Sequence, residues 1–255
     1  MKIISFTGPK GSGKDTSADI LREEKISTGS LAFAGPLKKI CTEVFDLHHN
    51  FMNDPLLKEK PLAEPIVLSA KHFRKINLAM TNHLEQDEFF YTPHKAAISG
   101  LEGMVITTPR QLLQVIGTDY IRDRVHPDWH LQAAFSKTSL AKLKGDLYCV
   151  TDVRFPNEYL FLVDKFGDDF KGFYVERPEA EAKLLLSQHA SEIQVREVKK
   201  LIKEDNILVN DGEIKDLKKK LLALKLEELP KFKKGGESGS QFKFVAAGKR
   251  DEGAF

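Results

Sequence analysis

Short apolar runs and longer amphipathic stretches alternate along most of this chain. The apolar runs predict five strands, which are Lys2–Phe6, Leu31–Ala34, Leu147–Thr151, Gly172–Glu176 and Ile207–Asn210. Most of these runs show no alternation of apolar and polar positions, which is typical of strands covered on both faces. Segments with helical spacing, such as Pro36–Phe45, lie between them. We therefore predict an α/β fold with a doubly wound, parallel five-stranded sheet.

Proline and capping residues mark where further helices begin. Thr108 is a predicted N-cap, and Pro109 is the first residue of a helix that continues to Ile116. Other helices are predicted after Pro156 and over Glu213–Leu224. Each lies between two predicted strands or after the last one, as a doubly wound fold requires.

Two regions break this alternation. Residues 46–107 are polar and irregular, with a weakly helical stretch over Lys71–Leu84, and we interpret them as an insertion that forms a substrate-covering subdomain. Residues 227–255 are rich in Lys, Gly and Ser without periodicity, which is typical of a disordered tail. The expected organisation is one domain over residues 1–226 that carries the insertion, followed by the tail.

The composition narrows the classes of protein that fit. With 255 residues, of which 41% are hydrophobic, the chain can bury a large core. Its net charge of +2 gives no general reason to expect a nucleic-acid or membrane partner. We expect neither a membrane span nor a signal peptide, and hence a cytoplasmic protein. Cys41 and Cys149 lie in apolar segments and are expected to be reduced core residues.

A glycine-rich loop follows the first predicted strand and precedes a helical pattern. Its sequence, Gly8-Pro9-Lys10-Gly11-Ser12-Gly13-Lys14, has the spacing of a phosphate-binding loop. Glycines let successive backbone N–H groups turn inward around an anion, and the helix that follows adds the positive end of its dipole. Lys14 brings a mobile charge to the outer phosphates. We expect Gly11, Ser12, Gly13 and Lys14 to bind nucleotide phosphates.

The residue after Lys14 departs from the usual loop. Ser or Thr commonly stands there and offers its hydroxyl to Mg²⁺, whereas this chain has Asp15 followed by Thr16. A carboxylate can also hold Mg²⁺, directly or through water, and an acidic residue in the first turn also stabilises a helix. We expect Asp15 or Thr16 to lie on the metal side, and the sequence does not distinguish them.

Charged residues follow the other predicted strands, at the sheet edge where ligands gather. Lys38 follows the second strand and Arg177 the fourth. Asp152 ends the third, where an acidic residue orients Mg²⁺ through water in phosphate-loop enzymes; a helix N-cap is the alternative. Arg154 suits bidentate contact with a phosphate. Glu158 can orient Arg154, form a simple salt bridge with it or bind a sugar hydroxyl.

A second polar cluster lies on the helix predicted in the middle of the chain. Arg110, Gln114 and Thr118 are spaced to lie near one face, where they fit a phosphate and a base edge. Trp129 is the single tryptophan, and its type fits either the core or stacking on a base.

The sequence offers no residue that stands out as a general base. A sugar acceptor usually needs an Asp to take its hydroxyl proton. A phosphate monoester needs none, because its second pKa of about 6 leaves it mostly a dianion at neutral pH. Positioning and charge neutralisation then suffice. Arg177, Lys183 and His189 flank or lie in a segment that can supply such charge as a lid. This pattern favours a phosphate acceptor.

These motifs together resemble the bacteriophage deoxynucleoside monophosphate kinases. The resemblance rests on Gly-Ser-Gly-Lys-Asp-Thr at residues 11–16, on residues 33–38, on residues 110–119 and on residues 152–158, with 189–192 and 210–212 in addition. It covers most of residues 1–224 apart from the insertion. The Asp that follows the lysine is shared with that family.

The resemblance implies a fold of the P-loop nucleoside monophosphate kinase type and transfer of the γ-phosphoryl group of ATP to a deoxynucleoside monophosphate, with Mg²⁺. It implies catalytic roles for Lys14, Asp15, Asp152 and Arg154. Metal contacts are expected from Asp15 or Thr16 and from Asp152. It places the acceptor on Lys38, Arg110, Gln114, Thr118, Trp129, Asp152, Arg154, Glu158 and Arg177. A phage protein would act in the host cytoplasm, and a homodimer is left open.

Two other functions stay open at this stage. One is a P-loop kinase for another phosphorylated small molecule, of the phosphomevalonate or dephospho-coenzyme A type. The other is an ATP-dependent switch module that contacts nucleic acid through its basic tail. A stacking aromatic residue with amides in the acceptor pocket would favour a base, and the nearly neutral net charge counts against nucleic acid.

Overall fold

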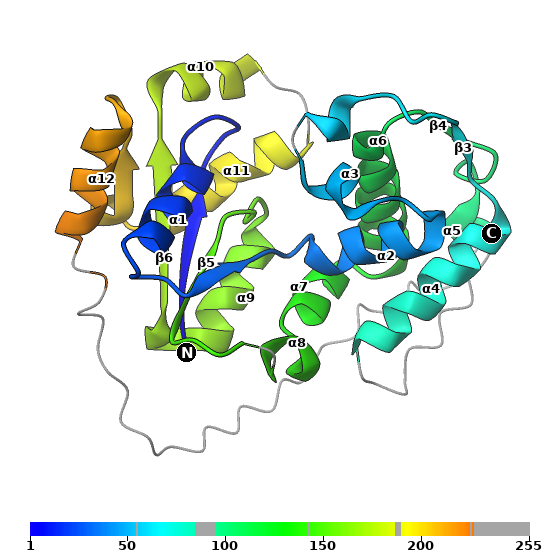
Figure 1. Cartoon of the computed structure of the whole chain (residues 1–255), viewed down its shortest axis with the longest axis horizontal. Helices are drawn as coiled ribbons and strands as arrows, with labels where there is room; N and C mark the ends of the chain where they lie inside the picture. Colours follow the sequence, from blue (N-terminus) through cyan, green and yellow to red (C-terminus); the bar gives the residue numbers. More distant parts are fainter. Residues whose placement is uncertain (55, 85–94, 142, 187–189, 225, 227–255) are drawn as a thin grey trace, which may run out of the picture.

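The computed structural model describes residues 1–54, 56–84, 95–141, 143–186, 190–224 and 226. The predicted tail over residues 227–255 and the lid candidate His189 lie outside the described residues. The described chain forms two lobes that lie side by side, a sheet lobe on the left of Figure 1 and a helical lobe on its right.

A parallel sheet of five strands forms the first lobe. Its order is β2 (Gly29–Leu31), β5 (Leu147–Val150), β1 (Lys2–Thr7), β6 (Phe170–Glu176) and β7 (Ile207–Val209). The predicted parallel five-stranded sheet is thus confirmed. The second strand ends at Leu31, where the predicted strand begins. The reason is that the N–H groups of Phe33 and Ala34 donate to the carboxylate of Asp152 at 3.0 Å each.

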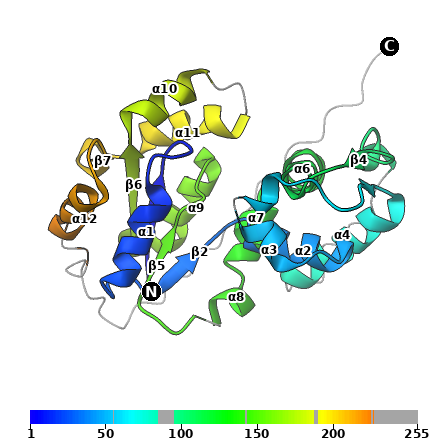
Figure 2. The same ribbon diagram turned by 45° about the horizontal axis from the view of Figure 1, so that its top comes forward.

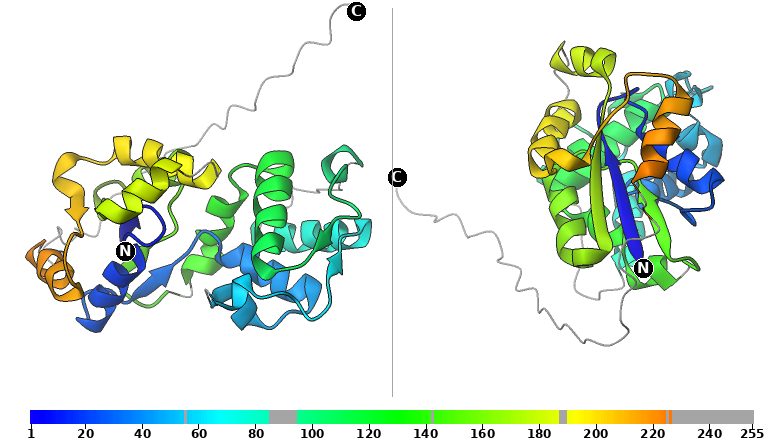
Figure 3. Two further views of the ribbon diagram at one scale, coloured as in Figure 1. Left: turned by 90° about the horizontal axis from the view of Figure 1, so that it is seen from above. Right: turned by 90° about the vertical axis from the view of Figure 1, so that its left-hand side faces the viewer.

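Helices cover both faces of this sheet, as the right-hand view of Figure 3 shows. One face packs against α1 (Lys14–Glu23) and α12 (Ile214–Ala223), and the other against α9 (Pro156–Phe166) and α11 (Ala190–Leu201). Consecutive residues of β1 pack on opposite faces of the sheet. Ile3 packs on the side of α9 and α11, and Ile4 on the side of α1 and α12. This two-sided burial explains the uninterrupted apolar runs.

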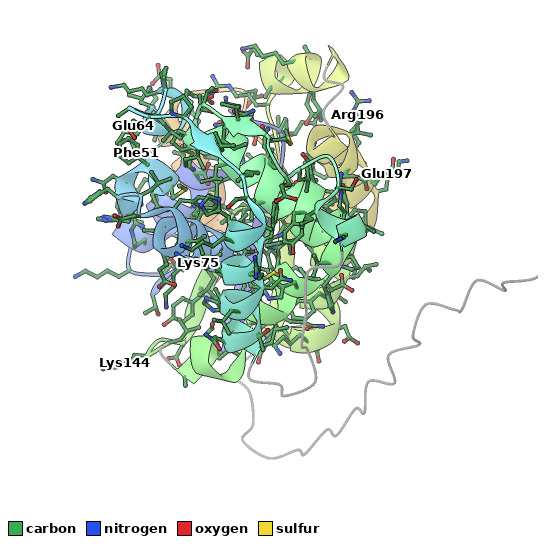
Figure 4. The ribbon with its side chains drawn as sticks, turned by 90° about the vertical axis from the view of Figure 1, so that its right-hand side faces the viewer. Phe51, Glu64, Lys75, Lys144, Arg196 and Glu197 are labelled. Carbon is green, nitrogen blue, oxygen red and sulfur yellow. The ribbon has the colours of Figure 1, made fainter. Side chains whose placement is uncertain are left out.

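The helical lobe gathers around a separate apolar core (Figure 2). Its elements are α2 (Gly35–Phe45), α3 (His49–Asn53), η1 (Leu57–Glu59), β3 (Ile66–Val67), α4 (Ala70–Leu84), α5 (Lys95–Ile98), β4 (Val105–Ile106), α6 (Pro109–Gln114), the π-helix η2 (Val115–Val125) and α7 (Trp129–Ala134). In Figure 4, which looks onto this lobe, Phe51 and Lys75 mark α3 and α4. The short helix α8 (Lys137–Ala141) leads back to the sheet, and α10 (Pro178–Leu186) follows β6.

The described part of residues 46–107 contains more regular structure than its polarity suggests. It contributes Met52, Phe73, Ile76 and Met80 to the core of the helical lobe, all of them fully buried. The same core takes in residues outside that range, such as Ile40 of α2. The helical lobe therefore extends on both sides of the expected insertion. None of the helices in the described residues combines the length and apolarity that a bilayer crossing requires.

Candidate functional site

The glycine-rich loop connects β1 to α1 and is held by Asn210, a residue 198 positions after Ser12 in the chain. Gly13 has φ of 103°, a left-handed conformation that favours glycine. A Cβ at this position would lie 2.5 Å from Nδ2 of Asn210. That amide donates to the backbone oxygen of Ser12 at 2.8 Å. The loop thus keeps its shape because a glycine leaves room for the residue that anchors it.

The loop and the start of α1 are arranged to receive an anion. The N-cap of α1 is Gly13, which has no side chain. It therefore caps none of the N–H groups in the first turn of the helix. Lys14 Nζ lies 3.4 Å from the oxygen of Pro9 and 4.0 Å from Oδ2 of Asp15. Its ammonium group therefore folds back over the loop, where outer phosphates would bind.

A cavity of about 650 Å³, here called the loop cavity, opens beside these residues. Its wall includes Gly11, Gly13, Lys14, Asp15, Thr16, Arg177, Asn210 and Ile214. Among the predicted phosphate-loop residues, Ser12 lies inside the turn rather than in the wall: it is fully buried, and its N–H donates to the oxygen of Pro9 at 3.1 Å. Arg177, which the resemblance assigned to the acceptor, lines the loop cavity instead, because β6 lies beside β1.

The oxygens of Asp15 and Thr16 fit a magnesium ion. Both residues line the loop cavity, and the Asp15 side chain is 74% exposed, so its carboxylate is accessible from solvent. Mg²⁺ is usually held by one or two carboxylates together with substrate phosphates and water. Within the described ranges no group of three or more His, Cys, Asp or Glu side chains is placed to hold a metal by itself. A metal here would therefore depend on the nucleotide.

A second cavity, of about 280 Å³, lies between the two lobes and is here called the basic cavity. Five cationic residues and two acidic ones line it: Lys38, Lys58, Arg110, Arg122 and Arg154, with Asp152 and Glu158. They come from α2, η1, α6, η2, the segment between β5 and α9, and the first turn of α9. The excess of positive charge suits an anion such as a phosphate.

The predicted polar face of the central helix borders this cavity. Arg110, Gln114 and Thr118 all line it, although the helix changes from α6 to the wider π-helix η2 after Gln114. The predicted N-cap is confirmed, since Oγ1 of Thr108 accepts from the N–H of Gln111 at 3.1 Å. A Cβ at Gly117 would lie 2.5 Å from Leu37, so glycine lets η2 approach α2 closely.

Asp152 lies in the basic cavity and organises its wall. Its two carboxylate oxygens accept from the N–H groups of Phe33 and Ala34, so it fixes the turn into α2 that carries Lys38. Burial raises the pKa of Asp152, and these two N–H groups, Lys38 and Arg154 act against that rise. The structure does not bring Asp152 into the loop cavity with Asp15 and Thr16, and it does not use Asp152 as a helix cap.

Glu158 is also a structural anchor of the basic cavity. It accepts from the N–H groups of Arg154 at 2.7 Å and Phe155 at 3.1 Å, and it pairs with Arg122 at 2.6 Å. Burial raises the pKa of Glu158, and the charge of Arg122 is the largest influence in the opposite direction. Glu158 thus fixes the backbone of Arg154, while its ion pair is with Arg122, a residue that the sequence analysis did not select.

Trp129 belongs to the core and does not reach the basic cavity. It is fully buried in the core of the helical lobe, and its Nε1 donates to the oxygen of Met80 at 3.3 Å. The stacking role considered for this residue is therefore wrong. Its neighbour His130 lines the cavity instead; burial lowers the pKa of His130 to about 4, so the imidazole is neutral there.

Sequence reasoning also missed Lys58. It lies in the segment treated as irregular, where no periodicity singled out one lysine among several polar residues. Only the fold of the helical lobe brings η1 to α6 and the basic cavity.

Two curated viral proteins are similar to this chain. A deoxynucleoside-5'-monophosphate kinase of Escherichia phage T5 is 36% identical over 212 residues, which cover 74% of this chain and 83% of the phage protein. An Acanthamoeba polyphaga mimivirus protein with the provisional name deoxynucleotide monophosphate kinase is 26% identical over 232 residues, covering 88% and 95%.

No family model matches the chain. A solved structure, TT1252 from Thermus thermophilus, is 18% identical over 90% of this chain and 98% of its own, with a TM-score of 0.37.

Proposed function

Because this chain belongs to the deoxynucleoside monophosphate kinase family, we propose that it transfers the γ-phosphoryl group of ATP to a deoxynucleoside monophosphate, giving ADP and the diphosphate. The observation that carries the proposal is the pair of cavities. A glycine-rich loop at the start of a helix lines one, and five cationic residues line the other. A kinase with a phosphate acceptor needs both a site for a nucleoside triphosphate and a site for a second anion.

The loop cavity is the proposed ATP site. The backbone of Gly11 and Gly13 and the first turn of α1 would bind the phosphates, and Lys14 would neutralise their outer charge. Ile214, which is 68% exposed in the cavity wall, offers an apolar surface to the adenine. Asp15 or Thr16 would hold Mg²⁺, which supplies charge neutralisation on the phosphate oxygens when it is bound.

The basic cavity is the proposed acceptor site. Lys38, Arg110 and Arg154 would bind the phosphate of the deoxynucleoside monophosphate, and Gln114 and Thr118 supply polar groups for its sugar or base. The acceptor oxygen is already ionised at neutral pH, so the protein contributes alignment and positive charge rather than a base. Asp152 and Glu158 would act indirectly, by fixing the backbone segments that carry Lys38 and Arg154.

The experiment is a measurement of initial rates of ADP release with ATP, Mg²⁺ and each of the four common deoxynucleoside monophosphates. We expect release that depends on at least one of them, and a pattern across the bases that gives the selectivity. Lys14→Ala should abolish it, whereas Lys10→Ala, an exposed lysine of the same loop, should keep most of it. ADP release that is equally fast without any monophosphate would contradict the proposal.

A further inference from the structure

Lys58 occupies an unusual position in the wall of the basic cavity. It lies on the short η1 turn of the helical lobe, and its side chain is half-buried. Three cationic residues from other elements repel its charge electrostatically: Lys38 of α2, Arg110 of α6 and Arg154 before α9. Asp15, in the wall of the loop cavity, attracts it. Lys58 thus lies in the wall of the basic cavity, and its charge is within electrostatic reach of Asp15.

The ammonium group of Lys58 forms no hydrogen bond and no ion pair with the residues that the structure describes. Other cationic residues of the cavity do: Lys38 donates to Oδ1 of Asn53 at 3.2 Å, Arg110 pairs with Glu59, and Arg122 pairs with Glu158. A half-buried charge normally has an acidic or polar partner, because loss of hydration otherwise disfavours it. The contrast points to a ligand that supplies the missing negative charge.

In the free protein, the position of Lys58 disfavours its charged form. Burial lowers the pKa of Lys58 to about 8, and Lys38, Arg110 and Arg154 add to the fall, while Asp15 acts against it. Asp152 is a further acidic group of the same wall, held by backbone N–H groups. Residues that are destabilising in the free protein are typical of binding and catalytic sites. An anion among these cations would remove the repulsion.

We propose that Lys58 is a catalytic residue that contacts the phosphate oxygens of the ligand in the basic cavity. The inference rests on the proposed function and deepens it, because it assigns a residue to the phosphoryl group in transit. An oxygen of the acceptor phosphate forms the new bond to the γ-phosphorus. The bond from that phosphorus to the β–γ bridging oxygen breaks, and its electron pair leaves with ADP. Lys58 keeps its proton and neutralises charge throughout.

The phosphate oxygens that Lys58 contacts can belong to the acceptor monophosphate or to the γ-phosphoryl group of ATP, and the kinetics of a Lys58 variant distinguish the two. Contact with the acceptor in its ground state raises the KM for the monophosphate when Lys58 is removed. Contact with the group in transit lowers kcat. We expect the second effect, because Asp15 of the loop cavity lies within electrostatic reach of Lys58.

The test compares Lys58→Met with Lys60→Met, an exposed lysine two residues further on. We expect kcat/KM of Lys58→Met to fall roughly 10- to 100-fold, the usual loss for a hydrogen bond to a charged group. Its melting temperature should rise, because the repulsion is gone. Lys60→Met should match the wild type in both. A merely structural role for Lys58 would instead lower the melting temperature, and equal kinetics of the two variants would overturn the inference.

Lys58→Arg adds a pH readout. The kcat/KM of the wild type reports groups of the free enzyme and should decline above about pH 8, as Lys58 loses its proton. A guanidinium stays charged there, so Lys58→Arg should keep its activity to higher pH. An unchanged alkaline limb would contradict a direct role of the ammonium. If the wild type transfers no phosphoryl group to any deoxynucleoside monophosphate, the proposed function fails; if it does so and Lys58→Met is unimpaired, this inference alone fails.

Discussion

The side-chain amide of Asn210 donates a hydrogen bond to the backbone oxygen of Ser12 across 2.8 Å, and so joins the end of β7 to the phosphate loop. The two residues are 198 positions apart, and the bond is buried. The same amide occupies the space that any side chain at Gly13 would need. The shape of the loop therefore depends on the last strand of the sheet as well as on its own glycines.

Asn210→Asp should weaken ATP binding more than acceptor binding. The substitution replaces a buried donor by an oxygen that faces the oxygen of Ser12, so we expect a loss of about 1–3 kcal/mol in stability and a higher KM for ATP. Urea unfolding and initial rates with ATP varied measure the two effects. Asn82→Asp, at an exposed position of α4, is the matched control. An unchanged KM for ATP would show that the loop keeps its shape without this bond.

Substitutions in the two cavities should separate the two substrates. Arg177→Ala removes a cation from the loop cavity and should raise the KM for ATP, whereas Arg110→Ala should raise the KM for the monophosphate, each roughly tenfold. Initial rates with each substrate varied in turn give both constants. An increase in the KM for the monophosphate with Arg177→Ala would restore the acceptor role that the resemblance implied for it.

Trp129 should report the fold rather than the substrate. Because it is the single tryptophan and is fully buried, the native protein should emit as a buried indole, and deoxynucleoside monophosphates should leave that emission nearly unchanged. Trp129→Ala should cost about 3–5 kcal/mol in the free energy of unfolding. Fluorescence titration and urea unfolding test this. Strong quenching by a monophosphate would indicate the stacking contact that the structure excludes.

The pH dependence of stability should carry the signature of Lys58. Its pKa falls from 10.5 to about 8 on folding, so the folded state binds this proton less tightly than the unfolded state. This group therefore raises the free energy of unfolding as pH rises from about 8 to 10.5, and the gain is lost as pH falls through about 8. Urea unfolding of the wild type and Lys58→Met at pH 7 and pH 9.5 gives the difference. Parallel values for the two proteins would contradict the lowered pKa.

The sheet could be predicted from the sequence because its physical cause is local and repeated. Strands buried on both faces are apolar throughout, and the glycine-rich loop between β1 and α1 has a spacing that few other structures need. The boundary of β2 could not be predicted, because it is set by the contact of Asp152 with the N–H groups of Phe33 and Ala34, about 120 residues away along the chain.

The acceptor side could be predicted only in part. The helical spacing of Arg110, Gln114 and Thr118 already places them on one face, and the structure brings that face to the basic cavity. Lys58 and Arg122 could not be selected, since their roles arise from how η1 and η2 pack against other elements. Trp129 shows the opposite case. A tryptophan can stack on a base or pack in a core, and only its burial in the structure distinguishes these two roles.

The most direct test of the account follows the label from γ-³²P-ATP in the presence of Mg²⁺ and a deoxynucleoside monophosphate. We predict that the label appears in the deoxynucleoside diphosphate in an amount equal to the ADP formed, that chelation of Mg²⁺ stops it, and that Lys14→Ala abolishes it. Label recovered only as inorganic phosphate, or in no product while ATP still binds, would contradict phosphoryl transfer between the two cavities.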